Sequence, residues 1–97
     1  MILQQEDLTI HNLEKCFAAA SEQDKQYIGV LIEMKGFPRP EVIINENANF
    51  DAKFDYYKAA YDENLNHKQA PGIRIIGFTY GDDYAGIEYD LLLPKEA

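Results

Sequence analysis

The chain has 97 residues, and its 17 Asp and Glu against nine Lys and Arg give a formal net charge of −8. This length suffices for a single globular domain, residues 1–97, with one small core. The negative charge repels polyphosphate, so it excludes ordinary electrostatic binding to DNA, RNA or an anionic membrane. Apolar residues make up 46% of the chain, which is enough to disfavour intrinsic disorder.

The cysteine count and the apolar segments indicate a cellular compartment. Cys16 is the only cysteine, which excludes an intramolecular disulfide and any multi-cysteine metal site. The sequence has no basic segment followed by a signal-like apolar run, and no stretch approaches the roughly 18 apolar residues that span a bilayer. We therefore expect a cytoplasmic protein that is neither secreted nor membrane-spanning.

The first half of the chain predicts a helix and a hairpin. Four apolar residues recur at helical spacing: Ile10, Leu13, Phe17 and Ala20. They predict a helix over about residues 8–21, with Asp7 or Thr9 as its N-cap. The β-branched, almost continuously apolar run 27–34 predicts a strand at the centre of the sheet, buried on nearly both faces. Prolines then interrupt the pattern, and the run 41–45 is expected to complete a hairpin.

The second half predicts a helix, a strand and a short terminal element. Five apolar residues fall within a sector about 80° wide on a helical wheel: Phe50, Phe54, Tyr57, Tyr61 and Leu65. They predict a helix over about residues 49–65. Residues 73–80 have the composition of a strand. The tail, 84–93, fits a short helix capped by Asp82 or Asp83, or a strand by period-two alternation, and we favour the helix.

The element order is helix, strand, strand, helix, strand, helix, which predicts an α+β fold. In this fold two or three helices cover one face of a small sheet of about three strands. A right-handed crossover through the helix at 49–65 is expected to place the third strand parallel to the second. Such a sheet has two open edges and limited burial, and both favour homodimerisation.

Few residues suit catalysis. Cys16 lies inside a predicted helix beside apolar residues, so we interpret it as a core thiol and not as a nucleophile. His11 and His67 are the only imidazoles, and we expect capping or solvent roles, with His67 near a helix C-terminus that favours a cation. Neither a Walker A loop nor a Gly-x-Gly-x-x-Gly motif occurs, so no nucleotide cofactor is indicated. The sequence therefore predicts no catalytic, cofactor-binding or metal-binding residues.

The candidate protein-interaction surface lies on the helix at 49–65. On the helical wheel, four residues cluster on the side away from the apolar stripe formed by the five residues above: Ala52, Tyr56, Ala59 and Glu63. Tyr56 is then an exposed aromatic residue between two alanines, and a tyrosine adds contact area with little rotamer entropy to lose. The alternative is a tyrosine on an ordinary solvated face.

The excess of carboxylates supports two further hypotheses. An acidic mimic of DNA could inhibit a host DNA-binding protein or nuclease by presenting acids in place of phosphates. A small carboxylate–metal protein or enzyme could use Asp82, Asp83 and Glu88, whose oxygens suit Mg²⁺ or Ca²⁺. Their spacing does not match an EF-hand loop, so helix capping and solvation explain these acids better.

Three segments carry a resemblance to known sequences: Gly-Phe-Pro-Arg-Pro-Glu-Val-Ile-Ile-Asn at 36–45, Phe-Asp-Tyr-Tyr-Lys-Ala-Ala-Tyr-Asp at 54–62 and Ile-Ile-Gly-Phe-Thr-Tyr-Gly-Asp at 75–82. Over roughly residues 27–92 the chain resembles small uncharacterised open reading frames of bacteriophages and prophages in Gram-positive bacteria. The resemblance implies an accessory protein made inside a bacterial cell and acting on host or phage proteins. We therefore expect a phage-like interaction module that binds another protein or itself.

Overall fold

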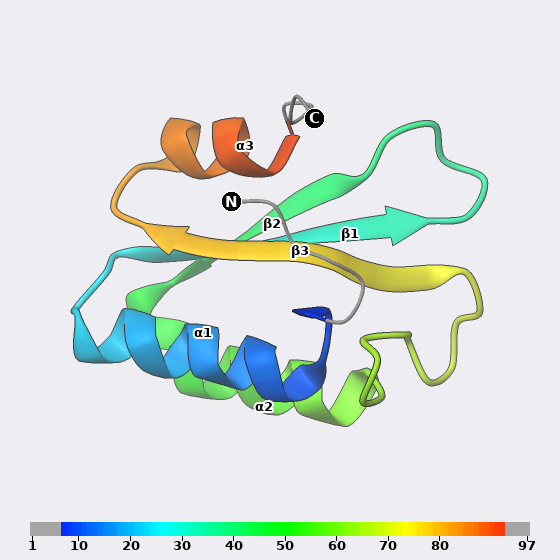
Figure 1. The fold of residues 1–97 in the computed structure, drawn as a ribbon, viewed down its shortest axis with the longest axis horizontal. Helices are drawn as coiled ribbons and strands as arrows, with labels where there is room; N and C mark the ends of the chain where they lie inside the picture. Colours follow the sequence, from blue (N-terminus) through cyan, green and yellow to red (C-terminus); the bar gives the residue numbers. More distant parts are fainter. Residues whose placement is uncertain (1–6, 93–97) are drawn as a thin grey trace.

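The computed structural model describes residues 7–92. Their elements follow one another in the predicted order (Figure 1): α1 (Ile10–Glu22), β1 (Tyr27–Met34), β2 (Glu41–Glu46), the 3₁₀ turn η2 (Asn47–Asn49), α2 (Phe50–Ala60), β3 (Ile73–Gly81) and α3 (Tyr84–Leu92). The α+β fold with a three-stranded sheet is confirmed, and the tail forms a helix and not a strand. Within residues 7–92, no helix combines the length and apolarity needed to cross a membrane.

The sheet has the order β2-β1-β3, so β1 is its central strand as predicted. β2 and β3 both pair with β1 in antiparallel fashion, with Val30 opposite Ile43 on one side and Phe78 on the other. β3 therefore runs in the same direction as β2, but the two strands are not neighbours, because β1 lies between them. The order follows from burial, since residues 28–31 of β1 are all buried and a fully apolar strand is best placed in the middle of a sheet.

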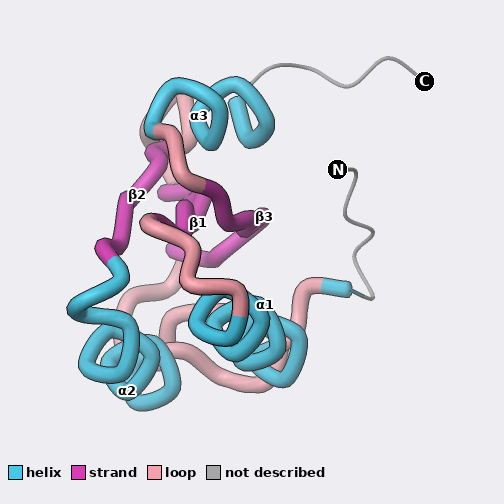
Figure 2. The backbone as a smooth tube through the Cα atoms, turned by 90° about the vertical axis from the view of Figure 1, so that its left-hand side faces the viewer, coloured by secondary structure: helices cyan, strands magenta, loops and turns pink. Residues whose placement is uncertain are grey.

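The helices cover both faces of the sheet, which corrects the expectation that they share one face. α1 and α2 lie on one side, and α3 lies on the other (Figure 2). The reason is that β1 carries apolar residues on both of its faces, and each face must be shielded from water. Ile87 of α3, only 2% exposed, supplies this shield on the second face.

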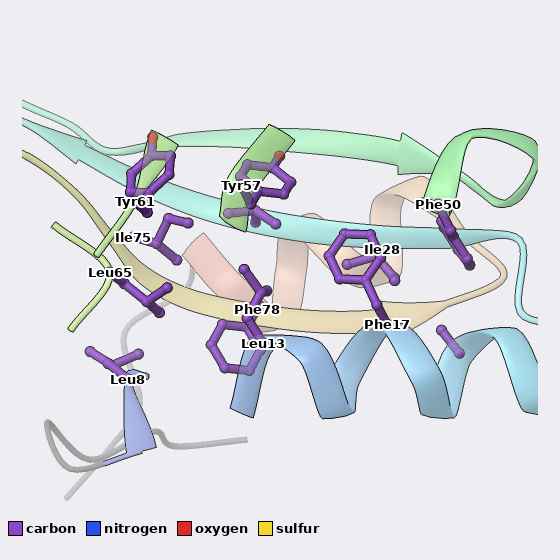
Figure 3. Packing of buried hydrophobic residues seen from close by; sticks show 12 residues of the cluster. Leu8, Leu13, Phe17, Ile28, Phe50, Tyr57, Tyr61, Leu65, Ile75 and Phe78 are labelled. Atoms are coloured by element: carbon purple, nitrogen blue, oxygen red, sulfur yellow. The ribbon is translucent and has the colours of Figure 1, made fainter. Parts of the chain in front are cut away.

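The larger core fills the layer between the sheet and the pair α1 and α2 (Figure 3). Its buried residues come from all of these elements and from the segments beside them: Leu8, Leu13, Phe17, Ala20, Ile28, Val30, Phe50, Tyr57, Tyr61, Leu65, Ile75 and Phe78. The side chain of Thr9 caps α1 by accepting the backbone N–H of Asn12 at 3.1 Å, as one of the two predicted caps.

α2 ends at Ala60, five residues before the predicted end at Leu65. The segment that follows is a turn organised by Asp62, whose Oδ1 accepts the backbone N–H groups of Asn64 and Asn66 at 2.9 and 3.0 Å. Asp and Asn side chains compete with the helix for backbone groups, so this cluster stops α2. Leu65 reaches the core through a left-handed backbone conformation, with φ 63°, and not as part of the helix.

Candidate functional site

The four predicted interaction residues are all exposed, but only three lie on α2. Ala52, Tyr56 and Ala59 project from its outer side, and 53% of the Tyr56 surface is exposed. Glu63 lies in the turn beyond the end of α2, so the wheel that placed it on the same helical face is wrong for this residue. The backbone carbonyl of Glu63 accepts the N–H of Ile10 at 2.9 Å, which ties this turn to the start of α1.

Tyr56 forms one wall of a surface hollow. Its ring packs edge-on against the ring of Tyr57, with 5.3 Å between the centroids. Tyr57 therefore supports one side of the Tyr56 ring, although about half of Tyr56 faces solvent. The hollow has a volume of about 300 Å³. Its other lining residues come from the end of α2 and from the loop that follows: Ala59, Ala60, His67, Lys68 and Gln69.

His67 holds this loop in place. Its Nδ1 accepts the backbone N–H groups of Gln69 and Ala70, both at 3.1 Å, and its ring packs edge-on against Tyr61 at 5.1 Å. Nδ1 therefore serves as the hydrogen-bond acceptor that closes this turn. α2 ends at Ala60, seven residues before His67, so the expectation that His67 lies at a helix C-terminus is wrong. The Lys68 N–H then donates to the last carbonyl of α2, that of Ala60, at 2.9 Å.

Tyr57, whose ring contacts Tyr56, forms a buried polar pair with Asn45. The Tyr57 hydroxyl donates to Oδ1 of Asn45 at 3.2 Å, and Nδ2 of Asn45 donates to the Ile28 carbonyl at 3.1 Å. Asn45 is 1% exposed, so these bonds replace the water it has lost. Burial raises the pKa of Tyr57, and its hydrogen bond to Asn45 offsets part of this effect. The pair links α2 to the two strands above it.

The remaining chemically interesting residues have structural roles. Cys16 packs beside the core, and burial raises its pKa to about 12, so near neutral pH it is a thiol and a poor nucleophile. Asp82 Oδ1 accepts the Gln26 N–H at 2.9 Å, and its Oδ2 lies 3.6 Å from the Lys25 ammonium. Asp83 caps α3 by accepting the Gly86 N–H at 2.8 Å. Among residues 7–92 no three His, Cys, Asp or Glu side chains lie close enough to hold a metal ion.

A second surface feature, a groove between α1 and α2, did not emerge from the sequence. It has a volume of about 550 Å³. Four residues of each helix line it: Glu14, Phe17, Ala18 and Ser21 on α1, and Phe50, Asp51, Phe54 and Asp55 on α2. Phe50 and Phe54 belong to the apolar stripe of residues 49–65 that the sequence assigned wholly to the core, but Phe54 is only half-buried. Asp51 and Asp55, which lie beside that stripe in the sequence, were the signal that could have indicated this groove.

Comparison of the chain with protein families, with curated proteins and with solved structures found no match. Function is therefore inferred from the chemistry of these two surfaces.

Proposed function

We propose that the chain is a protein-interaction module that associates with a second copy of itself through the outer side of α2. One observation supports this proposal above others: Tyr56 is 53% exposed, is held from below by Tyr57, and adjoins a hollow of about 300 Å³. A fixed aromatic ring loses little entropy on binding and is a frequent centre of binding energy.

The arrangement suits a twofold interface. In such an interface the same patch serves both copies, so a protruding group on each copy must meet a depression on the other. Tyr56 is the protruding group, and the hollow bounded by Ala59 and Lys68 is the depression. Ala52 and Ala59 have small side chains on either side of the ring, so they let a second backbone approach closely.

Charge gives this association a characteristic salt dependence. Each copy carries a formal net charge of −8, so two copies repel one another over distances longer than the contact itself. Added salt screens that repulsion. Self-association through Tyr56 is therefore expected to strengthen as salt rises, which is the opposite of binding driven by attraction between unlike charges.

Sedimentation equilibrium over a range of protein and salt concentrations tests the proposal. The wild type is expected to dimerise, and more tightly at high salt. Tyr56→Asp is expected to be monomeric, because it buries a charge at the contact. Tyr89→Asp is the matched control, since Tyr89 is 64% exposed on α3, on the other side of the sheet. The proposal would be contradicted by a wild type that is monomeric under all conditions, or by a dimer that is lost in Tyr89→Asp but kept in Tyr56→Asp.

For the cellular context we follow the sequence resemblance and propose an accessory protein of phage type that acts in the bacterial cytoplasm. The single cysteine supports a reducing compartment. A pull-down from bacterial lysate at low and high salt tests this context. A DNA-binding protein or nuclease released by salt would favour the acidic mimic of nucleic acid instead, since that binding depends on charge.

A further inference from the structure

The groove between α1 and α2 combines one partly accessible aromatic ring, Phe54, with an acidic rim. Phe17 lies in contact with both phenylalanines of α2, at 5.6 Å from Phe50 and 5.5 Å from Phe54 between ring centroids. Figure 3 shows the Phe17 side chain directed from α1 toward the sheet. Ala18 and Ser21 have small side chains, so the α1 side of the groove stays low and Phe54 remains partly accessible.

The rim carries three carboxylates and no basic residue: Glu14, Asp51 and Asp55. All three are exposed, and none forms an ion pair with another described residue. Asp51 lies in the first turn of α2, where a negative charge is stabilised by the helix dipole. Glu14 and Asp55 lie within their helices and have no such role. Their charges therefore face the groove without a partner.

We propose that this groove binds a basic segment of a partner protein, with an arginine or lysine side chain lying in it. The apolar stem of such a side chain would cover Phe54, and its charged head would reach Asp55 and Glu14 at the rim. A cation near the face of an aromatic ring gains further attraction from the ring quadrupole. Arginine fits best, because its planar group both stacks on rings and pairs with carboxylates.

The shape of the groove favours a peptide segment over a small free cation. Sites for quaternary ammonium ions enclose the charge in an aromatic cage. Here Phe17 packs against Phe50 and Phe54, but only Phe54 is partly accessible, and the acids lie on both helices beside it. A side chain that extends from a peptide backbone can follow such an open groove. The net charge of −8 adds long-range attraction for a basic partner.

This site is separate from the surface proposed for self-association. Tyr56 and its hollow share no lining residue with the groove. A partner in the groove is attracted by unlike charge, so added salt weakens its binding. Self-association is expected to respond to salt in the opposite direction. Failure of one proposal is therefore distinguishable from failure of the other.

Fluorescence anisotropy with a short dye-labelled peptide of alternating arginine and alanine tests the groove. The wild type is expected to bind this peptide, and a peptide of alternating glutamate and alanine is expected not to bind. Glu14→Gln/Asp55→Asn should weaken binding about fivefold or more, since it removes two contacts of surface ion-pair strength. Phe54→Leu keeps an apolar side chain but removes the ring, and should weaken binding about twofold or more.

The matched control is Glu88→Gln/Asp90→Asn on α3, on the opposite side of the sheet. Each double variant changes the net charge from −8 by two, to −6, so long-range attraction falls equally in both. The control is expected to bind within about twofold of the wild type. Equal losses in the two double variants would overturn the proposal, as would absence of peptide binding. Stoichiometric displacement of the peptide by spermidine would also overturn it, in favour of a polyamine site.

Discussion

Replacing Gly29 by alanine is expected to force α3 away from the sheet. A Cβ atom at this position of β1 would overlap Cγ2 of Ile87 and would lie 3.1 Å from Cδ1 of Leu91. Cγ2 belongs to a β-branched side chain, which in a helix is almost confined to one χ1 rotamer. Because Ile87 is also 2% exposed, it cannot turn aside, and the helix itself must shift. Overpacking of this kind costs about 1–3 kcal/mol.

Gly77 supplies a matched control on the neighbouring strand. An alanine Cβ there would meet Leu91 at 3.5 Å and Leu31 at 3.6 Å, which are ordinary contact distances. Gly77→Ala is therefore expected to change the free energy of unfolding by less than about 1 kcal/mol and can increase it, because alanine loses less backbone entropy on folding.

A double-mutant cycle separates the steric effect from a general intolerance of Gly29. Ile87→Ala alone should cost about 2–4 kcal/mol, since it opens a cavity. In that background Gly29→Ala should cost under about 0.5 kcal/mol, because the overlapping methyl group is gone and the free end of Leu91 can move. Urea denaturation followed by circular dichroism measures all four proteins. Equal destabilisation by Gly29→Ala in both backgrounds would refute the close packing of α3.

Three further predictions concern the interior and the start of α3. Tyr57→Phe leaves the buried Oδ1 of Asn45 without its donor and should lower the free energy of unfolding by about 1–2 kcal/mol. Tyr61→Phe removes a hydroxyl that has no hydrogen bond within residues 7–92, so it should lower this free energy by less. Urea denaturation measures both variants. Burial raises the pKa of Cys16 from 9.0 to about 12, so between these pH values the folded chain keeps a proton that the unfolded chain releases. The free energy of unfolding should therefore fall as pH rises from 9 toward 12, and it should fall less steeply in Cys16→Ala. Asp83→Ala removes the cap of α3 and should cost about 1 kcal/mol, with faster amide exchange in α3 than in α1.

The strands were predictable because their signals are local. β1 and β3 begin and end within one residue of the predicted 27–34 and 73–80, since each is a continuous apolar run bounded by turn residues. The end of α2 was not predictable from periodicity, because Tyr61 and Leu65 fall on the apolar stripe whether or not the helix continues. The deciding feature is Asp62, which binds the amides of the next turn.

The candidate surfaces were predictable only in part, because local patterns in the sequence do not show which distant segments come together. Exposure of Tyr56 follows from its place on the wheel, since the core stripe lies on the other side of the helix. The hollow beside it depends on His67 and Lys68, which reach α2 only because the chain folds back after the turn. The face covered by α3 likewise depends on tertiary packing, although two glycines, Gly29 and Gly77, already mark the strand positions where a helix can approach.

α2 links the two proposed surfaces, and this has a consequence for binding strength. Successive residues on a helix point about 100° apart, so Asp55 and Tyr56 face different neighbours although they are adjacent in the chain. Because the hollow beside Tyr56 and the groove share no lining residue, we expect a dimer formed through Tyr56 to leave both grooves open. A partner with two basic segments would then bind both grooves with a gain in avidity. Tyr56→Asp is therefore expected to weaken binding to such a bivalent partner and to change binding of a single basic peptide by less than about twofold. Equal weakening of both would mean that the two surfaces are not independent.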